Sequence, residues 1–102
     1  MNPQPKIKNF RSRKYLDFIK TKPSLKSGQY GTADDQIVPA HQDFGACGTA
    51  LKSPDIYAVP LLASEHHEEH HGAKTFWGDQ YEALPLRCLE YINEFLSEGG
   101  KF

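Results

Sequence analysis

The sequence predicts a small α+β domain in which two short strands and a histidine-bearing helix lie between an N-terminal and a C-terminal helix. Apolar residues near both ends of the chain recur at helical spacing. Between them, two short segments with β-branched residues flank a glycine-rich loop. A run of histidine and glutamate over residues 66–71 follows the second segment. The chain of 102 residues is expected to form one domain with a small core, spanning residues 1–102.

The N-terminal part is expected to be flexible over residues 1–9 and helical over about 11–22. The first nine residues are mostly polar and hold two prolines. Ser12 is a candidate N-cap, and Pro23 would stop the helix. The apolar residues with helical spacing are Phe10, Tyr15, Phe18 and Ile19.

Residues 36–41 and 55–61 are predicted strands, separated by a glycine-rich loop over 42–54. Pro39 favours a strand edge or end in the first of them. Ser64 is a candidate cap for the histidine-bearing helix, which Gly72 would end. Strands and helix together form a core unit over residues 36–72.

Two further helical segments are predicted after this unit. A turn or short helix is expected over 75–81, where Phe76 and Trp77 are expected to pack into the core. An amphipathic helix follows over about 85–97, with Pro85 in its first turn and the pair Gly99-Gly100 after its end.

Charge is distributed unevenly along the chain, although the formal net charge is only −1. Residues 1–28 hold eight Lys or Arg and one Asp, and the rest of the chain holds four basic and twelve acidic residues. A basic arm on an acidic domain indicates a polyanion partner such as DNA, or else a solvated helix face.

The sequence carries no signal for a membrane or for secretion. The chain has no apolar run long enough to cross a membrane, and no apolar stretch follows its N-terminal lysines. Cys47 and Cys88 form no CxxC pair and no disulfide framework. Both are therefore expected to be reduced thiols in a cytoplasmic protein.

Histidine pairs at i and i+4 are the strongest chemical signal. His66 and His70 would share one helix face, as would His67 and His71, and such a pair can close on one metal ion. His41 ends the first strand. The strand order would bring it, together with Asp55, to the face of the first pair.

These groups suit phosphodiester hydrolysis. A neutral imidazole can take a proton from water, and a divalent ion can neutralise charge on the phosphate. Such an ion would bind His66, His70 and Asp55. Imidazole favours Zn or Ni, and the carboxylate also allows Mg or Mn. In the glycine-rich loop, Lys52 is a candidate phosphate contact.

The chain resembles the HNH (ββα-metal, or His-Me finger) endonucleases. More narrowly, it resembles a small phage and prophage branch related to the recombination enhancement function nucleases, and the similarity covers about residues 10–96. The segments that carry the resemblance are Arg11–Phe18, Ile37–His41, Gly48–Asp55, Ala58–Leu61, His66-x-x-x-His70 and Phe76-Trp77.

The resemblance implies metal-dependent cleavage of DNA in the cytoplasm of a bacterial host. His41 would be the general base, and Asp55 would stand beside the metal. His66 and His70 match the helix ligands in spacing, with His67 and His71 as the alternative pair. The basic residues of the first helix, Arg11, Arg13 and Lys14, would grip the DNA backbone.

The sequence departs from the family pattern at three places. Ala40 replaces a ligand that often precedes the base, and Gln42-Asp43 replaces an Arg that often follows it. Ser24–Gly28 and Leu62 replace the cysteines of a structural zinc knuckle, so packing is expected to take over its contribution to folding. Two alternatives therefore stay open. One is a non-catalytic DNA- or protein-binding module on this fold, and the other is a histidine-rich metal-binding protein. Oligomeric state cannot be predicted.

Overall fold

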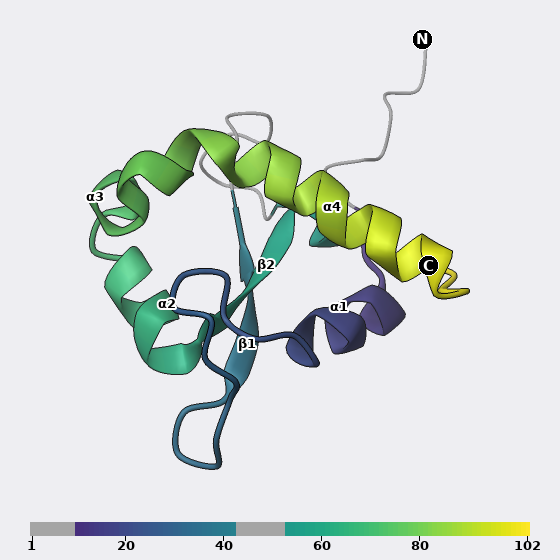
Figure 1. The fold of residues 1–102 in the computed structure, drawn as a ribbon, viewed down its shortest axis with the longest axis horizontal. Helices are drawn as coiled ribbons and strands as arrows, with labels where there is room; N and C mark the ends of the chain where they lie inside the picture. Colours follow the sequence, from purple (N-terminus) through teal and green to yellow (C-terminus); the bar gives the residue numbers. More distant parts are fainter. Residues whose placement is uncertain (1–9, 43–52) are drawn as a thin grey trace, which may run out of the picture.

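The computed structural model describes residues 10–42 and 53–102, and the predicted α+β class is confirmed (Figure 1). A two-stranded antiparallel hairpin lies between the helices. The expected flexibility of residues 1–9 lies outside the described residues. The strands are β1 (Ile37–His41) and β2 (Ala58–Leu62), the helices are α1 (Arg13–Lys20), α2 (Ala63–Glu69), α3 (Ala73–Trp77) and α4 (Leu84–Ser97), and two 3-10 turns are η2 (Asp55–Tyr57) and η3 (Gly78–Ala83).

The register of the hairpin places Pro39 of β1 directly opposite Pro60 of β2. Backbone hydrogen bonds at the two ends of the ladder, from Ala63 to Gln36 and from Gln42 to Tyr57, fix which residue pairs are hydrogen-bonded. By the alternation of an antiparallel ladder, the two prolines then form a pair without hydrogen bonds. The hairpin thus contains two prolines without losing a bond between its strands.

Helix α1 begins where the sequence predicts. The Ser12 hydroxyl accepts a hydrogen bond from the Tyr15 backbone N–H at 3.2 Å, which confirms Ser12 as the N-cap. The buried side chains of Tyr15 and Ile19 pack against Phe95 of α4. The helix is shorter than the predicted range, because its last turn closes at Thr21 before Pro23.

The second predicted strand begins later than expected. Its first three residues form the turn η2, in which the Tyr57 N–H donates to the carbonyl of Pro54. This turn buries Asp55, whose backbone N–H donates to the Phe10 carbonyl at 3.0 Å. The Phe10 carbonyl therefore accepts the backbone N–H of Asp55, which a neighbouring strand would accept if Asp55 lay in the sheet.

The prediction that Ser64 caps the histidine-bearing helix is wrong. Helix α2 begins at Ala63, and the Glu65 carboxylate accepts from the Leu62 N–H at 3.0 Å. Ser64 instead donates to Asp35 through both its N–H and its hydroxyl. The regular helix also ends before the last two histidines, at Glu69. Beyond this point, the N–H groups of His71 and Gly72 donate to the carbonyls of the residues three positions earlier, which continues the last turn as far as Gly72.

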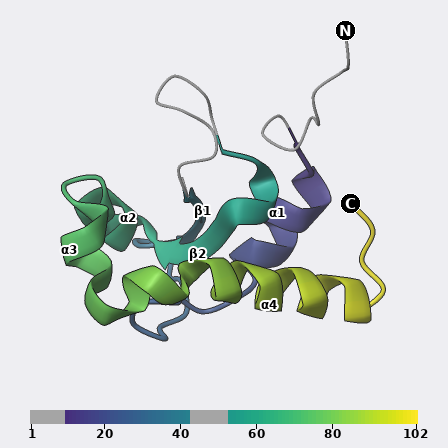
Figure 2. The same ribbon diagram turned by 90° about the horizontal axis from the view of Figure 1, so that it is seen from above.

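The main core lies where the hairpin meets the C-terminal half of the chain. Trp77 is 1% exposed, and Phe76 packs at the margin of the same cluster, so their predicted core position is confirmed. Helices α1 and α2 lie on either side of the hairpin, and α4 runs past it (Figure 2). None of the helices in the described part is long and apolar enough to cross a membrane. The other buried members of the cluster are Ala40, Val59, Leu61, Leu84 and Cys88.

The loop after α1 is fastened to the start of α2 through Ser24. The buried Ser24 hydroxyl donates to Glu65 at 2.5 Å and accepts from the backbone N–H groups of Lys26 and Ser27. The next residue, Leu25, donates its N–H to the Pro60 carbonyl of β2. Hydrogen bonds therefore hold this loop, in which the sequence has no cysteine to bind a structural zinc.

Replacing Ser24 by Ala should lower the free energy of unfolding by about 1–3 kcal/mol. The substitution removes the only side-chain hydroxyl in these contacts and leaves two backbone N–H groups and the Glu65 carboxylate without their partner. Urea denaturation measures the change, with Ser27→Ala in the exposed part of the same loop as the control. Equal stability of the two variants would contradict this role of Ser24.

Candidate functional site

A cavity of about 320 Å³ lies between the end of β1, the end of α2, α3 and the start of α4. His41, His66 and His70 all line it. The structure thus brings together three of the predicted site residues, although 24 residues separate the first two in sequence. Asp55 is not among the lining residues.

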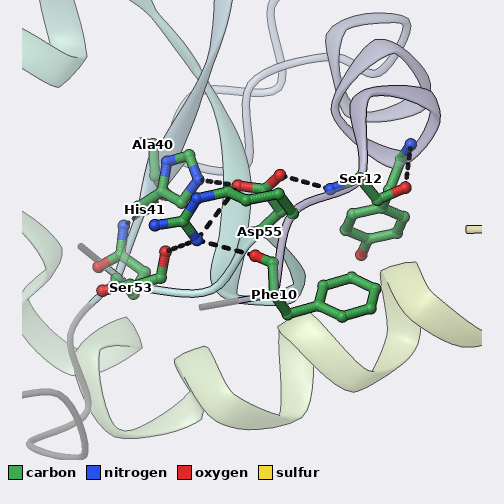
Figure 3. A network of polar contacts seen from close by, with 9 residues as sticks. Phe10, Ser12, Ala40, His41, Ser53 and Asp55 are labelled. Atoms are coloured by element: carbon green, nitrogen blue, oxygen red, sulfur yellow. Dashed lines mark hydrogen bonds and ion pairs between the residues drawn. The ribbon is translucent and has the colours of Figure 1, made fainter. Parts of the chain in front are cut away.

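The His41 imidazole contacts a buried carboxylate (Figure 3). Its Nε2 lies 2.8 Å from Asp55 Oδ1, while the backbone N–H of Ser12 donates to Oδ2 at 2.7 Å. The side chain of Asp55 is only 4% exposed, and that of His41 is 33% exposed. The geometry makes Asp55 an acceptor that orients His41, with its two oxygens already engaged.

The rings of His66 and His70 face each other across one helix turn. Their Nε2 atoms are 3.3 Å apart, and the His66 Nδ1 lies 3.3 Å from Glu69 Oε1. Two nitrogens bound to one tetrahedral zinc at ordinary bond lengths are about 3.3–3.4 Å apart. The spacing of this pair therefore fits a single metal ion. In residues 10–42 and 53–102, no group of three His, Cys, Asp or Glu side chains is clustered as a metal site.

Glu69 is a site residue that the sequence analysis missed. Its carboxylate is buried and accepts from Gln42 Nε2 at 2.8 Å and from Trp77 Nε1 at 2.6 Å. The run of six polar residues is typical of a solvated turn, so nothing in its composition marks one carboxylate as buried. The usable signal is spacing, because a Glu three residues after a His shares its helix face.

The second histidine pair belongs to a different part of the surface. His67 and His71 have ring centroids 5.0 Å apart, and both side chains are exposed. His71 lines a separate cavity with Lys26, Glu68 and others, of about 480 Å³. Neither member of this pair lines the cavity that contains His41.

The predicted nucleic-acid contacts lie on and before α1. Arg13 and Lys14 are exposed on the helix. Arg11 is held by the carbonyls of Phe10 and Ser53, with its Nη1 also 3.9 Å from Asp55 Oδ1. One buried carboxylate therefore lies against both His41 and a half-exposed guanidinium. Lys52 lies outside the described residues.

Cys88 is not available as a nucleophile. It is a free thiol in the main core, 3% exposed, and burial raises its pKa to about 12. The thiol therefore stays protonated at neutral pH, and a protonated thiol is a poor nucleophile. Cys47, the other predicted thiol, lies outside the described residues.

Comparison of the chain with known proteins gave one family. No curated protein and no solved structure matches the chain. A family model described as "Protein of unknown function (DUF968)" matches residues 2–99. Since this match covers nearly the whole sequence, the chain belongs to that family.

Proposed function

We propose that the protein is a metal-dependent endonuclease of phage or prophage origin that hydrolyses DNA phosphodiester bonds on a ββα-metal (HNH) core. One observation carries the proposal: His41, at the end of β1, shares a cavity with the His66–His70 pair of α2. Hydrolysis of a phosphodiester needs a base for water and a cation for the phosphate, and this cavity offers residues for both.

His41 is suited to the role of general base. If its Nε2–H donates to Asp55, the other ring nitrogen, Nδ1, carries a lone pair that can accept a proton from water. The buried carboxylate holds this tautomer and stabilises the imidazolium that forms. Asp55 then acts through His41, which is a different role from the metal ligand that the sequence predicts.

The metal would be held by His66 and His70, whose Nε2 atoms have the spacing that one ion requires. A divalent cation there would neutralise the charge that develops on the phosphate oxygens during cleavage. The two imidazoles leave other coordination positions for solvent and phosphate. Mg, Mn, Ni and Zn are the candidates, and imidazole ligation favours the last two.

The basic residues near α1 are suited to binding the DNA backbone. Arg11 reaches the same carboxylate as His41, so a phosphate bound by its guanidinium would lie near the base. Arg13 and Lys14 extend the positive surface along the helix. Contacts of this kind read no sequence, and the affinity for DNA should fall as salt concentration rises.

The experiment is cleavage of plasmid DNA by the purified protein with Mg, Mn, Ni or Zn, and with EDTA as the metal-free control. Cleavage by the wild-type protein should depend on metal. The double variant H66A/H70A should lose this cleavage and the associated metal affinity. The matched control H67A/H71A removes two histidines from the same turn and should retain both. Loss of cleavage only in the second variant would move the metal to the alternative pair.

A second candidate function is a DNA- or protein-binding module on the same fold. The described residues bring no third metal-ligating side chain to the His66–His70 pair, and Ala40 precedes His41 where a ligand could stand. Salt-dependent binding to DNA without cleavage in any of the four metals would favour this function over the endonuclease.

A further inference from the structure

Glu69 occupies an unfavourable position for a carboxylate. It is the last residue of α2, where the helix dipole is negative, and it is only 7% exposed. Burying an ionised carboxylate costs free energy unless hydrogen bonds compensate for the lost water. Three hydrogen-bond donors from three parts of the fold compensate the Glu69 carboxylate for the lost water. They are Gln42 after β1, Trp77 in α3 and His66 in α2.

The way these donors are divided between the two oxygens of Glu69 determines which ring nitrogen of His66 carries the proton. Gln42 Nε2 and Trp77 Nε1 both donate to Oε2, and neither group can act as an acceptor. Oε1 is left for His66 Nδ1 at 3.3 Å. The ionised carboxylate can only accept, so Nδ1 must carry the proton. The lone pair of His66 is then on Nε2, the atom that faces His70.

The same carboxylate also joins the two sides of the cavity. Gln42 follows His41 in the chain, and its amide donates both to the Ala40 carbonyl at 3.1 Å and to Glu69. The end of β1, which carries His41, is thereby tied to the helix that carries His66. A change in Glu69 would affect the spacing of both groups.

We propose that Glu69 is a positioning residue that keeps the proton of His66 on Nδ1 and its Nε2 lone pair directed to the metal, an inference that rests on the proposed function. Glu69 touches no reacting atom in this arrangement. It acts through His66, in the way that outer carboxylates orient metal-binding histidines.

Glu69→Gln is the sharp test. Gln has nearly the same shape, but it has one acceptor oxygen and a donor NH₂ group. Its oxygen is needed by Gln42 and Trp77, so the NH₂ group faces His66 and moves the His66 proton to Nε2. We expect ¹⁵N NMR of the metal-free protein above pH 7.5 to show His66 protonated at Nδ1 in the wild type and at Nε2 in the variant. Affinity for Ni²⁺ or Zn²⁺ by calorimetry should fall by about 10- to 100-fold.

Glu68→Gln is the matched control, because it makes the same chemical change at the exposed neighbouring position. It should change neither the His66 tautomer nor the metal affinity. If the wild-type protein shows His66 protonated at Nε2, or if E69Q binds metal like E68Q, the positioning role is overturned. The wild-type NMR measurement decides the matter even if E69Q does not fold. Neither readout involves DNA, so a failure of the endonuclease proposal is seen separately in the plasmid assay.

Discussion

His41→Ala should lower the rate of DNA cleavage by about 10²- to 10⁴-fold, the usual contribution of a general base. The variant removes the imidazole that would take the proton from water. His66 and His70, which would hold the metal ion, are unchanged. The fold should be retained, because the His41 side chain is partly exposed and Asp55 keeps its bond to the Ser12 N–H. Single-turnover cleavage of a plasmid under saturating metal measures the rate.

The control for this variant is His67→Ala. It also removes one imidazole, from an exposed position that does not line the cavity. Metal affinity and circular dichroism should be the same in the two variants and in the wild type. Cleavage by H41A at a rate close to that of H67A would remove His41 from the role of base.

Asp55→Asn is the second prediction with a large effect, again about 10²- to 10⁴-fold in the rate of cleavage. The Ser12 N–H is a fixed backbone donor, so the single oxygen of Asn should turn toward it. The NH₂ group then faces His41 Nε2, which becomes an acceptor. The proton of His41 moves to Nδ1, where it blocks the transfer from water.

The double variant D55N/H41A shows whether Asp55 acts through His41. If it does, the double variant should cleave DNA no more slowly than H41A alone, since both changes remove one function. Metal affinity distinguishes the remaining role. Calorimetry should give unchanged affinity for D55N if Asp55 orients His41, and a marked loss would instead make Asp55 a metal ligand.

The sequence was sufficient for the order of the elements, because the signals for these are local. The Ser12 hydroxyl caps α1 by accepting a hydrogen bond from Tyr15, three residues later in the chain. Trp77 has a large apolar ring and is buried in the core. The placement of the imidazoles followed in part from spacing, since i and i+4 residues share a helix face whatever the rest of the fold does.

The roles of the two carboxylates depended on parts of the chain that are distant in sequence. Asp55 contacts Ser12, which is 43 residues away, and Glu69 contacts Gln42, which is 27 residues away. A short segment of sequence around Asp55 does not include Ser12, and one around Glu69 does not include Gln42. For this reason the sequence predicts Asp55 as the first residue of a strand and does not mark Glu69 as a site residue.

The facing prolines of the hairpin also affect how the protein meets other chains. Residues in pairs without hydrogen bonds direct their N–H groups outward, along the open edges of a sheet, and such edges invite the addition of foreign strands. Pro39 and Pro60 remove the central outward donor from both edges, and Leu25 already occupies the outward carbonyl of Pro60. The two-stranded sheet that the described residues form is thereby protected against edge-to-edge aggregation.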